Sequence, residues 1–205
     1  MKTYRIHLIR HAEIAETAQG KYIGHTDVSL PEDSKEKARR LASDKIYPYA
    51  DAVFTSPLKR CTETAAILYP DIKAVPIEEL IECNFGEFEG KTADDLRENE
   101  DFAGWLAGKN APPFGESSRD FGARVITAFE KIADGMMKSG VPDVAIITHA
   151  GVMSAILAAY GIPEAPMHEW ITPNCCGYSV RLDPSIWMRG KKFEVYSKIP
   201  ENWDE

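Results

Sequence analysis

Two histidines that follow predicted strands are the residues of this sequence best placed to do chemistry. His11 stands just beyond the apolar run of residues 5–9, and His149 stands just beyond a second run at residues 144–147. Short apolar runs rich in β-branched residues are typical of parallel strands that are buried on both faces. Ligands bind at the carboxyl ends of such strands, so we expect both histidines to face one site.

Two arginines give this site the character of an anion pocket. Arg10 adjoins His11, and Arg60 follows a third predicted strand at residues 52–54. A guanidinium group donates hydrogen bonds in a planar fork that fits a phosphate group. A phosphate held by these arginines and His149 would lie against the ring of His11. Because neutral imidazole is available near pH 7, His11 is a candidate nucleophile toward phosphorus.

Glu82 is the candidate proton donor for the alcohol that leaves a phosphate ester. It stands between apolar neighbours in residues 80–86, a segment whose glycine and aromatic residues indicate a shaped loop. A carboxyl group there can protonate the leaving oxygen and then activate water against a phosphohistidine. The predicted catalytic residues are therefore Arg10, His11, Arg60, Glu82 and His149.

A metal site is the other chemistry that these residue types could support. His7 and His11 are four positions apart, but on a strand this spacing separates them by more than a ligand span. With no Cys/His or Asp/His cluster nearby, the sequence predicts neither a metal nor a cofactor. The cysteines include no CxxC pair, which excludes a zinc ribbon or a thioredoxin-type motif. His7, His25 and His168 are interpreted as structural histidines.

The segments between the motifs alternate between helical and strand patterns. Ser56 is a favourable N-cap and Pro57 a favourable first residue for a helix that ends at Pro70. Further helices are expected at residues 31–44, at residues 117–137 and after Gly151, and further strands at residues 178–182 and 193–196. This alternation predicts an α/β three-layer sandwich, with helices on both faces of a mostly parallel sheet.

The length favours one domain that spans residues 1–205. A chain of this size buries enough surface to need no disulfide or metal for stability. Residues 91–116 are polar and contain glycines and prolines, and we expect them to form short helices and loops as a flap over the site.

The composition limits the partners of the protein. A net charge of -8 disfavours nonspecific binding to nucleic acid or to anionic lipid. No apolar run approaches the ~20 residues of a membrane helix, and the amino terminus has no apolar signal-peptide core. We expect a soluble cytoplasmic protein, a monomer or a homodimer, whose partner is a small phosphorylated metabolite.

Five short motifs resemble those of the histidine phosphatase superfamily, in its phosphoglycerate mutase-like branch, and they stand in the order and at the spacing found in that family. They are Arg-His-Ala-Glu at 10–13, Ser-Pro-Leu-Lys-Arg at 56–60 with Thr-Ala at 64–65, Glu82 with Gly-Glu-Phe-Glu-Gly at 86–90, Gly-Glu-Ser at 115–117, and Thr-His-Ala-Gly at 148–151. Within the superfamily, residues 20–30 look most like those of α-ribazole phosphatases.

This resemblance implies a phosphoglycerate mutase-like fold and catalysis without a metal. It implies that His11 is the phosphorylated nucleophile, that Glu82 is the acid and base, and that Arg10, Arg60 and His149 bind the phosphate. It also implies substrate contacts at Thr17, Ile23 and Gly24, and we expect one more at Ala150, beside His149.

The sequence departs from the family pattern beside the nucleophile. Ala12 replaces the usual glycine, which the backbone tolerates if φ is negative, and Thr17 replaces the usual asparagine. Two alternatives to a phosphomonoesterase stay open. One is a mutase that returns the phosphoryl group to its substrate, and the other is a non-catalytic phosphate-binding protein. The intact set of five catalytic residue types disfavours the second, because a binding protein needs no nucleophile and acid together.

Overall fold

The computed structural model describes residues 3–15, 18, 20–44 and 47–201. In this part of the chain, seven strands form one sheet in the order β3-β2-β4-β1-β6-β7-β5. The strands are β1 (Tyr4–Arg10), β2 (Ala52–Thr55), β3 (Val75–Pro76), β4 (Asp143–Thr148), β5 (Gly161–Ile162), β6 (Gly177–Leu182) and β7 (Phe193–Ile199).

Parallel pairing dominates the half of the sheet that carries the motifs. Strands β3, β2, β4 and β1 run parallel, whereas β6 is antiparallel to both β1 and β7. β5 pairs parallel with β7 at the far edge. The register aligns Arg10 with Thr148, so His11 and His149 leave the sheet side by side at one edge. The predicted mostly parallel α/β sheet is confirmed.

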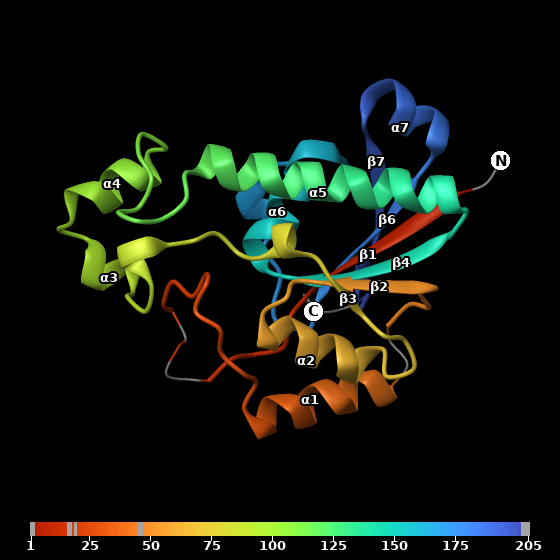
Figure 1. Ribbon diagram of the computed structural model, residues 1–205, viewed down its shortest axis with the longest axis horizontal. Helices are drawn as coiled ribbons and strands as arrows, with labels where there is room; N and C mark the ends of the chain where they lie inside the picture. The colour runs from red at the N-terminus through yellow and green to blue at the C-terminus, as the bar shows by residue number, and fades with distance from the viewer. Residues whose placement is uncertain (1–2, 16–17, 19, 45–46, 202–205) are drawn as a thin grey trace.

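Helices cover both faces of the sheet (Figure 1). α5 and α6 lie on one face, and α1 and α2 on the other, which confirms the three-layer sandwich. The helices are α1 (Glu32–Ser43), α2 (Lys59–Leu68), α3 (Ala93–Leu96), α4 (Glu100–Leu106), α5 (Ser118–Ser139), α6 (Ala150–Tyr160) and α7 (Pro184–Gly190), with 3-10 turns η2 (Glu78–Leu80), η3 (Gly86–Phe88) and η4 (Met167–Trp170). Among these described helices, none is long and apolar enough to cross a bilayer.

Helix α5 shows how the pattern of apolar residues produces the core. Ser117 caps its first turn by accepting a hydrogen bond from the backbone N–H of Asp120, and Gly140 ends it in the left-handed conformation that glycine favours. Its predicted apolar stripe is buried against the sheet, as the burial of Phe121, Val125, Ala128, Ile132 and Met136 confirms. Each large side chain of this kind stabilises the fold by about 1.5–3 kcal/mol when it leaves water.

The start of α2 differs from the prediction. The helix begins at Lys59 with Leu58 as N-cap, so the expected N-cap at Ser56 is wrong. The carboxylate of Asp27 instead accepts a hydrogen bond of 2.7 Å from the backbone N–H of Lys59. Ser56 is fully buried, and its hydroxyl lies 2.8 Å from Nε2 of His149. The Ser56 oxygen is thus shared between this tertiary partner and the backbone N–H of Leu58, which donates to it at 3.4 Å just before the helix begins.

Residues 91–116 form the short helices α3 and α4, which lie at the end of the molecule where α5 begins (Figure 1). An aromatic cluster fixes them to the preceding loops. The ring of Trp105 lies 5.5 Å from that of Tyr22 and 5.8 Å from that of Phe85, measured between centroids. Trp105 lines the cavity described below. Movement of this segment as a flap stays a prediction.

Candidate active site

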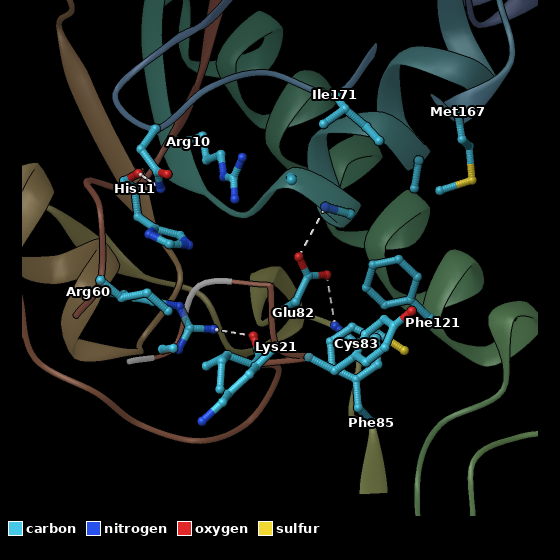
Figure 2. Close-up of a pocket in the computed structure, with 18 of the residues that line it drawn as sticks. Arg10, His11, Lys21, Arg60, Glu82, Cys83, Phe85, Phe121, Met167 and Ile171 are labelled. Carbon is cyan, nitrogen blue, oxygen red and sulfur yellow. Dashed lines mark hydrogen bonds between the residues drawn. The ribbon is translucent and has the colours of Figure 1, made fainter. Parts of the chain in front are cut away.

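A cavity of about 870 Å³ opens at the carboxyl edge of β1 and β4. Four of the five predicted catalytic residues line it (Figure 2), namely Arg10, His11, Arg60 and Glu82. Of the predicted substrate contacts, Ile23 and Ala150 also line it. Within the described part of the chain, Gly24 and His149 are not among the lining residues, and both contact the buried guanidinium of Arg60 instead. Thr17 lies outside the described residues.

His11 is held as a neutral imidazole with one free nitrogen. Its Nδ1 lies 2.7 Å from the carbonyl oxygen of Ala12. A carbonyl only accepts, so Nδ1 carries the proton and Nε2 keeps its lone pair. Burial, reinforced by the charges of Arg60 and Arg10, lowers the pKa of His11 to about 3. The ring is therefore neutral throughout the physiological range, with its proton on Nδ1 and a lone pair on Nε2 that can act as a nucleophile.

The turn after His11 accommodates alanine in place of glycine. Among the described non-glycine residues, a positive φ occurs at Phe114, Cys175 and Lys191 but not at Ala12. The methyl group of Ala12 is buried, and its backbone N–H donates a hydrogen bond of 2.9 Å to the hydroxyl of Thr64. The backbone at this position thus meets the condition under which alanine can replace glycine.

Asn174 is a residue of this site that the sequence did not reveal. It lines the cavity, and its amide group donates a hydrogen bond of 2.9 Å to the carbonyl oxygen of His11. The next residue, Cys175, has a φ of 59° and donates its N–H to the carbonyl oxygen of Arg10 at 3.1 Å. The segment before β6 thus supports the backbone of both Arg10 and His11. Its only sequence signal was its place just before a predicted strand.

Arg60 is buried beneath the loop that it helps to organise. Its Nη1 donates to the carbonyl oxygen of Thr26 at 2.8 Å, and its Nη2 donates to that of Gly24 at 2.7 Å. Burial lowers the pKa of Arg60, but a guanidinium keeps its charge in proteins. A Cβ atom at Gly24 would lie 1.9 Å from the carbonyl oxygen of Cys83, so this close approach requires glycine.

Glu89 holds the same loop from the other side. Its carboxylate accepts hydrogen bonds from the backbone N–H groups of Gly24 and His25, at 3.0 and 2.9 Å, and from the hydroxyl of Thr26 at 2.7 Å. Its contact with Arg60 is thus indirect, through carbonyl groups of residues 24–26. Glu89 belongs to the Gly-Glu-Phe-Glu-Gly motif at residues 86–90, and the sequence alone predicts no role for it.

His149 stands behind the cavity and completes the surroundings of Arg60. Its Nδ1 accepts a hydrogen bond of 3.3 Å from Nε of Arg60, which leaves the proton on Nε2, beside the hydroxyl of Ser56. Burial lowers the pKa of His149 well below its usual range. The ring centroids of His149 and His11 are 5.2 Å apart. The predicted pair of histidines is therefore adjacent, but His149 contacts the arginine rather than lining the cavity.

Glu82 is a buried carboxyl group that faces the cavity with 8% of its surface exposed. The backbone N–H groups of Cys83 and Gly151 donate to its two oxygens at 2.9 and 3.0 Å. Burial raises the pKa of Glu82, although these two hydrogen bonds and the nearby arginines oppose the shift. A raised pKa lets the group hold a proton for transfer nearer to neutral pH.

Arg10 presents part of its guanidinium to the cavity. Nη1 donates to the carbonyl oxygen of Thr172 at 2.5 Å. Nε is buried and, within the described part of the chain, has no hydrogen-bond partner. A buried donor without a partner costs about 1–3 kcal/mol, and an anion in this cavity is a suitable acceptor.

In the described part of the chain, the three histidines interpreted as structural are not among the residues that line this cavity. His7 is 2% exposed, and its Nδ1 lies 2.9 Å from the hydroxyl of Ser179 on β6. His25 and His168 are exposed. In residues 3–15, 18, 20–44 and 47–201, no group of three or more His, Cys, Asp and Glu side chains is arranged to hold a metal ion.

The chain belongs to the histidine phosphatase superfamily (branch 1), whose sequence profile matches residues 6–189. It is 30% identical over 185 residues to the adenosylcobalamin/α-ribazole phosphatase of Salmonella typhimurium, an alignment that covers 87% of this chain and 90% of that protein. It is 28% identical over 158 residues to phosphoserine phosphatase 1 of Hydrogenobacter thermophilus, covering 74% of each. Family and relatives together identify a phosphatase, as predicted.

Solved structures give the same class of fold. The α-ribazole phosphatase from Shigella flexneri superposes with a TM-score of 0.76 at 25% identity, covering 94% of both chains. A phosphoglycerate mutase from Bacillus anthracis superposes with a TM-score of 0.76 at 18% identity, covering 96% of this chain and 92% of that one. The second likeness shows the fold alone, and it confirms the predicted phosphoglycerate mutase-like architecture.

Proposed function

We propose that this protein is a metal-independent phosphomonoesterase that acts on a small phosphorylated metabolite through a phosphohistidine at His11. The observation that carries the proposal is one cavity that holds a neutral histidine with a free Nε2 and a buried carboxyl group of raised pKa. A nucleophile and a proton donor with these protonation states are what ester cleavage needs near neutral pH.

In the first step, Nε2 of His11 attacks phosphorus in line with the ester oxygen. The N–P bond forms as the P–O bond to the alcohol breaks, and Glu82 gives its proton to the departing oxygen. Arg10 and Arg60 bind the equatorial oxygens, over which the charge of the transition state is spread. His149 orients Arg60 through the hydrogen bond to Nε.

In the second step, the Glu82 carboxylate takes a proton from water as the water oxygen attacks phosphorus. The N–P bond breaks, inorganic phosphate leaves, and both His11 and the protonated Glu82 are restored. The same carboxyl group therefore serves as acid and then as base.

The particular substrate is the finer part of the proposal. Relatives named for α-ribazole phosphatase activity align over most of this chain, so α-ribazole 5'-phosphate is the first metabolite to assay. A relative named as a phosphoserine phosphatase makes phosphoserine the natural comparison. Phosphoglycerate tests the mutase alternative.

The deciding experiment measures hydrolysis of p-nitrophenyl phosphate with and without a chelator, and traps the enzyme with ³²P-labelled substrate. We expect full hydrolysis with chelator and an acid-labile, alkali-stable label that is lost in His11→Ala. The exposed His168→Ala variant is the matched control and should keep the label. Phosphoryl exchange without hydrolysis would indicate a mutase, and phosphate binding with neither reaction would indicate a binding protein.

A further inference from the structure

We propose that the part of the cavity beyond Glu82 binds a flat, uncharged aromatic group on the alcohol of the ester. We call this part the aromatic slot, and its walls are Phe85, Trp105, Phe121, Met167 and Ile171. This inference rests on the proposed function, because it concerns the leaving group of that reaction. It assigns the specificity of the enzyme to side chains that do not touch the phosphate.

The direction of the reaction places the alcohol in the slot. In-line displacement puts the leaving oxygen on the side of phosphorus opposite to Nε2 of His11. Glu82 must reach that oxygen to protonate it. Figure 2 shows His11 on one side of Glu82 and the rings of Phe85 and Phe121 on the other. The alcohol of a bound ester therefore extends past Glu82 toward these rings.

One wall of the slot is aromatic. Phe121 is buried on the first turns of α5. The rings of Phe85 and Trp105 meet edge to face, 5.8 Å apart at an angle of 82°, and Tyr22 packs 5.2 Å from Phe85. Aromatic faces and edges held in this way favour a planar aromatic partner.

The opposite wall consists of apolar side chains that the fold leaves in water. Met167 is 45% exposed and Ile171 is 57% exposed, and both line the cavity (Figure 2). Large apolar side chains gathered at the rim of a cavity mark a ligand-binding surface. A methionine thioether also makes favourable contacts with aromatic rings. An aromatic group bound between the walls would remove both side chains from water.

The charges that line the cavity lie at its phosphate end rather than in the slot. The guanidinium of Arg124 lies 5.1 Å from the centroid of the Phe121 ring, but it does not line the cavity and is paired with the carboxylate of Glu116 at 2.7 Å. Figure 2 places the cations Arg10, Arg60 and Lys21 on the other side of Glu82 from Phe121 and Met167. The five residues that define the slot carry no charge. A carboxylate or a second phosphate bound among them would lose its hydration without gaining a cation, which is unfavourable. Compact charged esters such as phosphoserine are therefore disfavoured.

The size of the cavity agrees with a bulky substrate. Its volume of about 870 Å³ falls in the range of roughly 300–1,000 Å³ that encloses a drug-sized ligand. A phosphate group and a three-carbon chain would leave most of the slot unfilled. A two-ring aromatic alcohol would contact both walls.

The test compares ethyl phosphate with 2-(2-naphthyl)ethyl phosphate. Both release a primary alkoxide, so both need the same proton transfer from Glu82. A difference in kcat/KM between them therefore reports the contacts made in the slot. A single methylene in an apolar pocket is worth about tenfold in kcat/KM, and we expect the naphthyl ester to exceed the ethyl ester by about a hundredfold or more. O-phosphoserine should be no better than ethyl phosphate.

Substitutions in the slot then show which side chains cause the preference for the naphthyl ester. Met167→Gln and Ile171→Gln should each lower the naphthyl-to-ethyl ratio by at least about fivefold, because a polar amide replaces apolar contact. Met188→Gln is the matched control, since Met188 is 74% exposed on α7 and does not line the cavity. Its ratio should equal that of the parent protein.

The outcomes separate this inference from the proposed function. Hydrolysis of both esters with a ratio below about threefold would overturn the slot and leave the phosphomonoesterase intact. A large ratio that Met167→Gln and Ile171→Gln both leave unchanged would also overturn it. If neither ester is hydrolysed, the proposed function fails, and the slot is tested by calorimetric binding of 2-(2-naphthyl)ethylphosphonate. Equal affinities for the Ile171→Gln and Met188→Gln variants would then contradict the slot.

Discussion

The backbone N–H of Gly151 donates a hydrogen bond of 3.0 Å to Oε2 of Glu82, and the carboxylate lies so close that a Cβ atom at position 151 would displace it. Gly151 lies in the first turn of α6, which begins directly after His149. The partial positive charge of a helix N-terminus stabilises a carboxylate. The same turn therefore orients Glu82 and stabilises the charge that Glu82 acquires once it has given up its proton.

Replacing Gly151 tests this contact. A Cβ atom at this position would lie 2.4 Å from Oε1 of Glu82, so Gly151→Ala displaces the carboxyl group. A misplacement of about 1 Å can cost a hundredfold in rate, and we expect kcat for alkyl phosphates to fall by at least about tenfold. Gly135→Ala is the control, because a Cβ atom added at this position in α5 would meet no other atom within 4 Å. Equal kcat values in the two variants would contradict the assigned geometry.

Glu82→Gln separates the acid from the nucleophile. Alkyl phosphates release a strongly basic alkoxide and need the proton, so their hydrolysis should slow by about a hundredfold or more. A nitrophenyl ester releases a stabilised phenolate, so the rate at which it phosphorylates His11 should fall much less than the rate with an alkyl ester. Because glutamine cannot activate water, the phosphoenzyme should accumulate and give a burst. Equal slowing of phosphorylation for both esters would mean that Glu82 only positions the phosphate.

The raised pKa of Glu82 also sets a pH dependence. Burial raises the pKa of this carboxyl group, and only the protonated form can donate to the leaving oxygen. The rate of phosphorylation by an alkyl ester should therefore fall as the pH rises through this raised pKa. Single-turnover measurements across pH should show the fall in the parent protein and not in Glu82→Gln. A fall of the same size in both proteins would assign it to another group.

Glu89 is predicted to position Arg60 without touching the substrate. Its carboxylate holds residues 24–26, and the carbonyl groups of Gly24 and Thr26 accept hydrogen bonds from the guanidinium. Loosening this loop in Glu89→Ala should displace Arg60 and lower kcat/KM by about ten- to hundredfold. Competitive inhibition by inorganic phosphate should weaken in parallel. Glu87→Ala, in the same motif but exposed, should retain both values, and matching losses in the two variants would refute the role.

Because of His7, the fold should be less stable in mild acid than at neutral pH. Burial lowers the pKa of His7 to about 4, so the unfolded chain binds its proton more tightly. The contribution of neutral His7 to the free energy of unfolding is complete above the unfolded-state pKa of about 6.5, and it is lost as the pH falls toward 4. Between pH 7.5 and 5.0 this loss amounts to up to about 2 kcal/mol. Urea unfolding at both pH values should show a smaller difference for His7→Gln than for the parent protein.

Much of the active site could be predicted from local patterns. The apolar runs before His11 and His149 predict strands that end at these residues, and parallel pairing of neighbouring strands brings their carboxyl ends together. The stripe from Phe121 to Met136 predicts the buried face of α5 in the same way. These features depend on residue type and spacing along a short segment, which the sequence displays directly.

Contacts between distant segments were decided by the tertiary structure alone. Ser56 has the local chemistry of an N-cap, but its hydroxyl lies closer to the buried ring of His149, at 2.8 Å, than to the backbone N–H of Leu58, at 3.4 Å. Glu89 acts on residues 24–26, far away in sequence, and no spacing rule joins them. Met167 and Ile171 lie in a segment without periodic pattern, and only the path of the chain past the cavity makes them a wall. A side chain's type and spacing predict which element it joins, whereas its partner depends on how those elements pack.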